Sequence, residues 1–317
     1  RDRLMNQISV KSRKSYTTVT GKSGQISKFN LGRSGKYIIA IILIIITFFT
    51  SIFPIVSFAF ETFLPNPGDY SFLYTGDPDN LTTKWWVTNE NITENGMYGQ
   101  QGILYNDMIW HAYKGTIMVS VCCALTAGTI GTLIGYAVSK NRRSRWANYV
   151  NSMAFLPYLM PSIAVGVAFF ILFSNKYVNL FNTYALLIIV GTVKYIPFAS
   201  RSSLNSMLQL SGEIEEAAII QDIPWTKRMT RIIIPIQKTS IISGYLLPFM
   251  TCLRELSLFI LLCVQGFILS TTLDYFDEMG LYAFSSGINL ILIVTILICN
   301  ALVNKVTGAS LDKGIGG

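Results

Sequence analysis

The sequence predicts an all-α membrane protein with about six transmembrane helices. Hydrophobic residues make up 51% of the 317 residues and charged residues only 13%, a balance too apolar for an ordinary soluble domain. Apolar runs of about 20 residues recur, and a helix of that length crosses a hydrocarbon layer of about 30 Å. The predicted transmembrane segments are residues 37–60, 115–138, 147–173, 180–200, 239–264 and 285–304.

The charges of the loops orient these segments, because cytoplasmic loops of membrane proteins carry an excess of Lys and Arg. Residues 1–36 contain nine basic residues and one acid, which indicates a cytoplasmic basic arm or a linker between two halves. The loop 61–112 contains seven acids and a single lysine, so we expect it outside. Basic residues return between 140 and 145 and at Lys305, ahead of the tail 307–317, so both termini are expected in the cytoplasm.

Several residues within the predicted segments set their local shape. Prolines within or beside a membrane helix kink it or end it, and these are Pro157, Pro161, Pro197 and Pro248. Segment 115–138 is rich in Gly, Ala, Ser and Thr, which favours tight packing between helices over a pore-lining function. Lys194 lies near the cytoplasmic end of its segment, so we expect its ammonium group to reach the membrane border.

Composition also excludes several classes of function. The net charge of +8 is concentrated at membrane borders, beside anionic headgroups, without a basic-aromatic groove pattern, so nucleic-acid binding is not expected. All five cysteines lie in apolar segments, no CxxC pair is present and His111 is the sole histidine, so we expect no catalytic, metal or redox site. The cysteines are interpreted as small buried hydrophobic residues.

One short match to a nucleotide-binding motif fails on its spacing. Thr20-Gly21-Lys22-Ser23 matches the end of a phosphate-binding loop, but Tyr16 occupies the position of the required first glycine. We therefore exclude a nucleotide site in this segment. If the protein uses ATP, another subunit must hydrolyse it.

The outer loop 61–112 is longer than a simple connection. Its aromatic residues Trp85, Trp86 and Tyr98 are expected to anchor at the level of the lipid headgroups, where aromatic side chains gather in membrane proteins. The alternative is that the loop forms a docking surface for an external partner.

The polar segment 201–238 lies between two apolar segments and predicts a helix–turn–helix. Acids open the first helix, because carboxylates are stabilising near a helix N-terminus. Asp222-Ile223-Pro224 breaks that helix, and a second, basic helix is expected from Trp225 to Ile234, where Pro235 ends it. From these residues alone, the segment is either a docking element for a soluble partner or an amphipathic element resting on the membrane.

The spacing within this segment is specific. Glu216-Ala217-Ala218 is followed after three residues by Asp222, after nine more by Ile232, and then by Ile234-Pro235. This resembles the cytoplasmic EAA signature of permease subunits in binding-protein-dependent ATP-binding-cassette (ABC) importers, with Asp222 in place of glycine. Asp enters the left-handed backbone conformation at modest cost, so we expect the turn to form.

The resemblance makes residues 201–238 a coupling loop, which would bind the ATPase subunit. The residues to which it assigns this coupling are Gly212, Glu215, Glu216, Ala217, Ala218, Asp222, Ile232 and Pro235.

A second resemblance lies in segment 239–264. Arg254-Glu255-Leu256-Ser257 is similar to the corresponding stretch of ferric-iron-type importer permeases, and residues 18–22 resemble the link between the halves of their fused forms. A charge at the centre of a membrane helix costs about 2.5–3.5 kcal/mol, so Arg254 and Glu255 must face protein or water. They form either an ion pair between helices or, with Ser257, the lining of a translocation pathway or gate.

The resemblance implies a MetI-like importer-permease bundle over residues 37–306, in a bacterial plasma membrane and without a cofactor of its own. Its partners would be two ABC ATPase subunits holding ATP and Mg²⁺, an extracytoplasmic solute-binding protein, a second permease half or subunit, and the lipid bilayer. Ferric iron is the first expected substrate, with polyamines, thiamine and phosphonate-type solutes as alternatives. The alternative class is an autonomous channel or secondary transporter, which requires an inverted repeat or intramembrane carboxylates, of which we find only Glu255.

Overall fold

The computed structural model describes residues 32–75, 81–92 and 99–307, and the chain divides into two compact units between Phe53 and Pro54. Tyr98, the segment from Thr20 to Ser23, and most of the predicted basic arm and tail lie outside the described residues.

All the named elements in the described part of the chain are helical, which confirms the predicted fold class. The elements are α2 (Gly32–Thr47), η1 (Phe48–Ile52), α3 (Phe53–Glu61), α4 (Phe72–Thr75), α5 (Lys84–Val87), α6 (Asp107–Lys140), α7 (Arg145–Leu159), α8 (Ser162–Phe173), α9 (Tyr184–Gln209), α10 (Gly212–Ile220), α11 (Trp225–Arg228), η3 (Met229–Ile233), α12 (Ile234–Ile236), α13 (Lys238–Leu253), α14 (Leu269–Glu278) and α15 (Tyr282–Thr307).

The first unit consists of α2 and the π-helical turn η1. The described side chains of η1 and most of those of α2 are exposed and largely apolar, as expected of a helix that faces lipid. The π turn ends at Ile52, and the N–H of the following residue, Phe53, bonds to the carbonyl of Phe48.

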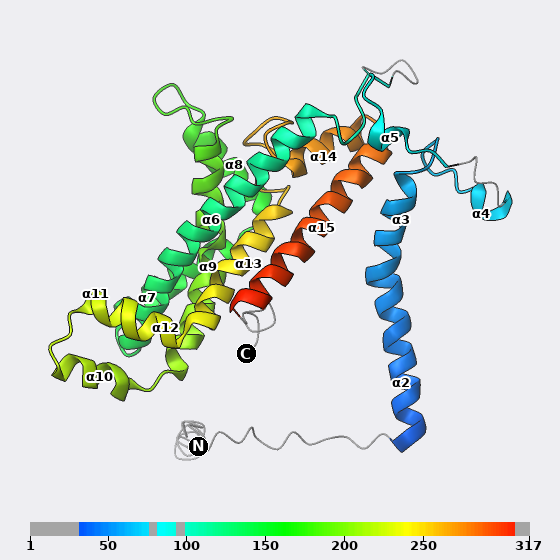
Figure 1. Ribbon diagram of the computed structural model, residues 1–317. Coiled ribbons are helices and arrows are strands. Elements are labelled where there is room, and N and C mark those ends of the chain that lie inside the picture. The colour runs from blue at the N-terminus through cyan, green and yellow to red at the C-terminus, as the bar shows by residue number, and fades with distance from the viewer. Residues whose placement is uncertain (1–31, 76–80, 93–98, 308–317) are drawn as a thin grey trace, which may run out of the picture. The chain divides into compact units, whose positions relative to one another are not determined.

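In the second unit, α6 and α9 pack along each other and α13 packs on both (Figure 1). Close approach is possible because α6 carries glycines at the contact. A Cβ added at Gly131 or Gly135 would lie 2.7 Å from the backbone nitrogen of Ser200 or Leu204 of α9, respectively. The prediction that the small residues of 115–138 serve helix packing is therefore confirmed. A cluster of buried side chains, which includes Cys123, forms the hydrophobic core between these helices.

Among the described residues, four helices are long and apolar enough to cross a membrane, and two bent helix pairs raise the number to six if each pair is one span. The four are Ser34–Glu61, Asp107–Lys140, Tyr184–Gln209 and Tyr282–Lys305. They agree with four of the predicted segments, although α9 runs on to Gln209, so residues 201–209 belong to a helix rather than to the loop. The two remaining predicted segments, 147–173 and 239–264, are not continuous helices, because the first is divided between α7 and α8 and α13 ends at Leu253 within the second.

The first of these segments breaks at Pro161. Helices α7 and α8 meet there at 101°, because proline has no N–H and cannot continue the hydrogen-bond ladder. The carbonyl of Pro157, which residue 161 would normally bond, instead accepts a hydrogen bond of 3.0 Å from the ammonium group of Lys194. The same group bonds the carbonyl of Met160 at 2.6 Å. Lys194 is only 8% exposed, so the prediction that it extends to the membrane border is wrong.

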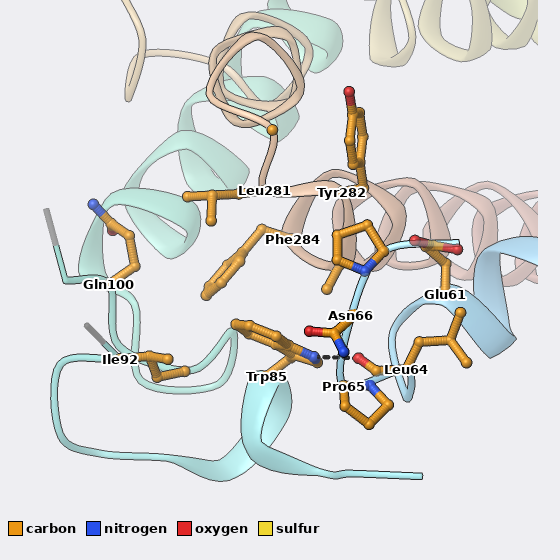
Figure 2. Close-up of a pocket in the computed structure, with 13 residues that line it drawn as sticks. Glu61, Leu64, Pro65, Asn66, Trp85, Ile92, Gln100, Leu281, Tyr282 and Phe284 are labelled. Atoms are coloured by element: carbon orange, nitrogen blue, oxygen red, sulfur yellow. Dashed lines mark hydrogen bonds between the residues drawn. The ribbon is translucent and has the colours of Figure 1, made fainter. Parts of the chain in front are cut away.

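Part of the outer loop folds onto the helices. The indole of Trp85 is 7% exposed, donates a hydrogen bond of 2.7 Å to the carbonyl of Leu64, and lies 5.9 Å from the ring of Phe284. Figure 2 shows these side chains around a pocket that Glu61 and Tyr282 also line. Trp85 is therefore a core residue, and the prediction that it anchors among lipid headgroups is wrong.

Candidate coupling site

The first helix of the coupling loop is α10. Ser211 caps it, with its hydroxyl oxygen accepting a hydrogen bond of 3.4 Å from the N–H of Glu213. Glu213 and Glu215 lie in the first turn, where carboxylates favour the positive end of the helix. The predicted helix after Ser211 is confirmed.

Asp222 forms the turn that ends α10. Its φ of 53° lies in the left-handed region, as the replacement of glycine by Asp predicts. The N–H of Asp222 bonds the carbonyl of Ile219 at 2.9 Å, and the N–H of Ile223 bonds the carbonyl of Ala218 at 3.1 Å. These two bonds form a Schellman motif, which satisfies carbonyls at the end of the helix.

The second helix of the loop differs from the prediction at its C-terminal end. It begins at Trp225 as expected, but it continues through a π-helical turn and α12 to Ile236, so Pro235 lies inside it. In the π turn the N–H of Ile234 bonds the carbonyl of Met229. We attribute the continuation to this wider turn, since it accommodates a residue that has no N–H of its own.

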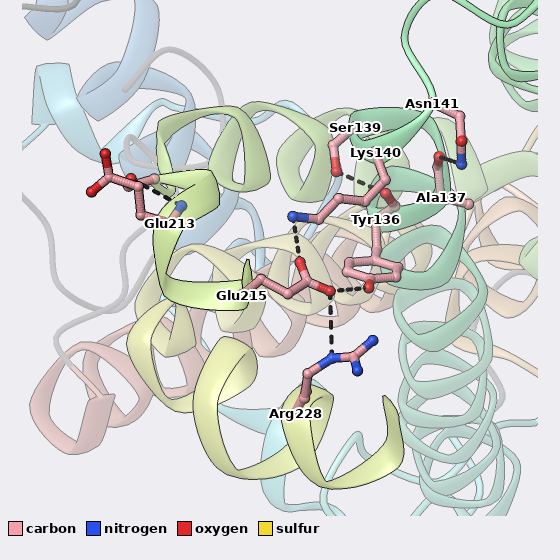
Figure 3. A network of polar contacts seen from close by, with 9 residues as sticks. Tyr136, Ala137, Ser139, Lys140, Asn141, Glu213, Glu215 and Arg228 are labelled. Atoms are coloured by element: carbon pink, nitrogen blue, oxygen red, sulfur yellow. Dashed lines mark hydrogen bonds and ion pairs between the residues drawn. The ribbon is translucent and has the colours of Figure 1, made fainter. Parts of the chain in front are cut away.

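Glu215 of α10 joins its own helix to α6 and α11 (Figure 3). Glu215 is 5% exposed, and its carboxylate accepts a hydrogen bond of 2.5 Å from the hydroxyl of Tyr136 on α6. It also forms an ion pair with Lys140, at the C-terminal end of α6, and lies 3.8 Å from Nε of Arg228 on α11. Arg228 in turn donates a hydrogen bond of 2.9 Å to the carbonyl of Ile223.

The electrostatics of this cluster favour the ionised carboxylate. Burial raises the pKa of Glu215, but the hydrogen bonds from Lys140 and Tyr136 and the positive charges of Lys140 and Arg228 outweigh burial. The pKa of Glu215 therefore lies below its ordinary value. The carboxylate is charged at neutral pH and is compensated by its own chain.

The structure divides the predicted coupling residues into two groups. Glu215 and Ala218 are buried against their own chain, and Ile232 is half-buried. The exposed members, which are free to meet a partner, are Gly212, Glu216, Ala217, Asp222 and Pro235.

The two most exposed isoleucines on α10 were missing from the predicted site residues. Ile219 is 50% exposed and Ile220 is 82% exposed, directly after the Glu-Ala-Ala sequence. Apolar side chains so exposed on a polar loop indicate an interaction surface. Their signal in the sequence was two adjacent isoleucines on a helix that lies between charged residues.

The second candidate group, around Arg254, is not in a helix. Helix α13 ends at Leu253, so the prediction that Arg254 and Glu255 lie at the centre of a membrane helix is wrong. Among the described residues, Glu255 bonds to Tyr195, whose hydroxyl donates a hydrogen bond of 3.1 Å, and not to a cation. Arg254 and Ser257 are exposed. Tyr195 was not among the predicted site residues.

The described residues hold no group of three or more His, Cys, Asp and Glu side chains that could bind a metal ion. Helix α10 presents the exposed carboxylate of Glu216 beside the exposed side chains of Ile219 and Ile220, a surface suited to recognition.

Comparison with known families matches residues 127–309 to the binding-protein-dependent transport system inner membrane component. The chain is 24% identical over 251 residues to the putative ferric transport system permease protein FbpB 1 of Haemophilus influenzae, covering 78% of this chain and 36% of that protein. It is 26% identical over 204 residues to the putrescine transport system permease protein PotI of Escherichia coli, covering 62% and 68%. The chain thus spans about a third of the ferric relative's length.

The fold is also similar to a solved structure. A bacterial ABC transporter involved in the import of the acidic polysaccharide alginate contains a chain that superposes with a TM-score of 0.62. The match covers 87% of this chain and 98% of that chain at 16% sequence identity. This likeness establishes a shared fold.

Proposed function

Because this chain belongs to the family of binding-protein-dependent transport system inner membrane components, we propose that it forms half of the pathway of an ATP-driven importer. It is a multi-pass membrane protein, and we place it in the bacterial plasma membrane with both termini in the cytoplasm. The partners we propose are two ATPase subunits, an extracytoplasmic binding protein and a second permease half. Family membership gives no support to the alternative of an autonomous channel.

The observation that carries the proposal is the exposed face of α10. Glu216 offers a negative charge to a basic group, and Ile219 and Ile220 offer apolar surface to a groove. A charged residue beside apolar anchors is a common composition for a docking surface, since the anchors supply affinity and the charge supplies specificity. We propose that the ATPase subunit covers this face.

In the proposed cycle, the partner subunits hold ATP and Mg²⁺. ATP binding draws together the coupling loops of the two permease halves and opens the pathway outward. Hydrolysis then releases the loops and returns the pathway to the inward-facing state. Alternation of this kind needs two global states that the ligand binds with different affinity.

The non-helical segment 254–268 is the basis on which we propose where the translocation pathway lies. Non-helical backbone at membrane depth occurs where it is buried in protein or lines a water-filled cavity. One side of the segment, including Leu258, Phe259 and Leu262, is buried in the core. Arg254 and Ser257 are exposed on the segment, and we propose that they line the pathway or its gate, while Glu255 orients the segment through Tyr195.

We propose ferric iron as the transported substrate, supported by the ferric relative that matches 78% of the chain. A polyamine is the second candidate, because the putrescine permease matches at a similar identity. Thiamine and phosphonate-type solutes remain alternatives from the sequence resemblance.

The docking surface is tested by Glu216→Lys, with Glu213→Lys as the matched control on the other exposed acid of α10. Each full-length chain is purified from membranes with its cellular partners, after its insertion is verified. We expect Glu216→Lys to lower the amount of retained ATPase about ten-fold or more, equivalent to about 1.4 kcal/mol, and Glu213→Lys to retain it. Equal retention by both variants, or no ATPase with the unsubstituted chain, would overturn the proposal.

A further inference from the structure

We propose that Glu215 is a positioning residue that locks the coupling loop to the end of α6, so that α10 and α6 move as one unit. This inference rests on the proposed function, because it assumes that an ATPase moves the loop. It assigns Glu215 and Glu216 different tasks although they are neighbours. Glu216 faces outward to a partner, whereas Glu215 faces inward to its own chain.

Side-chain interactions supply much of the connection between α10 and α6. Within the described chain, the backbone of α10 does not pack closely along that of another helix. Its inward connection to α6 runs through Glu215, which binds Tyr136 and Lys140 from successive turns of α6. Arg228 brings α11 to the same carboxylate, at 3.8 Å. One side chain therefore ties both helices of the loop to α6.

The burial of the Glu215 carboxylate makes the link between α10 and α6 stiff. A buried carboxylate is stable only while its partners compensate its charge, so separating α10 from α6 would leave charges without partners. The ring of Trp225 also lies 6.2 Å from the ring of Tyr136, which adds an apolar contact at the same junction. A small displacement of the coupling loop therefore displaces α6 as well, instead of changing the distance between α10 and α6.

Helix α6 leads from this junction into the centre of the bundle. It packs against α9 and α13, and its residues Val119, Cys123 and Ala127 belong to the central buried cluster. An ATPase that displaces α10 would therefore displace α6 with it. Rigid elements joined by packed contacts are the physical route by which such coupling travels.

The test follows the distance between α10 and α6 in the assembled complex. Spin labels are attached at Ala137→Cys on α6 and Gln221→Cys after α10, both exposed, in a chain whose own five cysteines are replaced by serine. The distance is measured without nucleotide and after trapping with ATP and vanadate. We expect the same distance in both states for the otherwise unsubstituted chain and for the control Glu213→Gln.

With Glu215→Gln, we expect the distance to shift or its distribution to broaden on trapping, while the ATPase is still retained. Tyr136→Phe removes one hydrogen bond and is expected to give a smaller shift, which keeps the test decisive if Glu215→Gln does not fold. A distance as constant in both variants as in the control would overturn the inference. Loss of the ATPase from Glu215→Gln would instead assign Glu215 to docking, and loss from the unsubstituted chain would overturn the proposed function.

Discussion

The ammonium group of Lys194 lies 3.0 Å from the carbonyl oxygen of Pro157 and replaces the N–H that proline at position 161 does not have. A break in a membrane helix leaves carbonyls without donors, and each is costly in a medium that supplies no water. Lys194 thereby stabilises the turn between α7 and α8.

Substituting Lys194 by Met is expected to lower the free energy of unfolding by about 1–3 kcal/mol, because the carbonyls of Pro157 and Met160 lose their donor. Thermal unfolding in detergent measures this change, and Lys176→Met, at an exposed lysine, is the control. In a Pro161→Ala background the new N–H can bond the carbonyl of Pro157, so the cost of Lys194→Met should be smaller there. An equal cost in both backgrounds would contradict the assigned contact.

Trp85 is expected to behave as a core residue. Trp85→Phe removes the hydrogen bond to Leu64 and part of the packing on Phe284, so we expect a loss of about 1–3 kcal/mol of stability. Trp146→Phe, at an exposed indole, should leave the unfolding temperature unchanged. The contrary result, an equal small effect at both positions, would return Trp85 to a membrane-anchoring function.

Asp222 tests the turn of the coupling loop. At a φ of 53°, a β-branched residue is strained, so Asp222→Val should cost about 1–2 kcal/mol and weaken retention of the ATPase. Asp222→Gly restores the residue of the resembled signature and should preserve both stability and retention. Equal stability and equal retention of the ATPase in the valine and glycine variants would contradict the claim that residue 222 acts through its left-handed backbone conformation.

The pKa of Glu215 predicts a pH dependence. Because this pKa is lowered in the folded protein, the carboxylate contributes stability above its ordinary pKa of 4.5, and this contribution is lost as the pH falls through the lower, folded-state pKa. The stability difference between the unsubstituted chain and Glu215→Gln, from unfolding curves at several pH values, should be constant above that value and shrink below it. A difference that stays constant down to the acid limit would contradict the charged network.

The sequence predicted the helical class and four of the spans because α2–α3, α6, α9 and α15 are long apolar helices whose hydropathy is a local property. It predicted the turn at Asp222 because a left-handed position has few permitted residues. The predictions that failed concern features that are determined by residues far apart in the sequence. The sequence contains three acids in four residues, and only the position of Tyr136 on α6 distinguishes Glu215 from Glu213 and Glu216.

The same reason explains the other errors. Hydropathy cannot show that α13 ends at Leu253, since apolar residues resume after Arg254-Glu255, and Leu258, Phe259 and Leu262 pack in one buried cluster with residues of α8 and α9. Nor can it show that Lys194 is held by carbonyls of another helix. Both depend on tertiary partners, which a local pattern does not contain.

The most direct test of the proposed docking surface is site-specific photo-cross-linking from Ile220, which is 82% exposed on α10. A photoreactive residue is placed there in the full chain and, as the control, at the exposed Tyr74 of the outer loop. We predict a covalent adduct with the ATPase subunit from position 220 and none from position 74. No adduct from position 220 in a correctly inserted chain, or equal adducts from both positions, would contradict docking through the coupling loop.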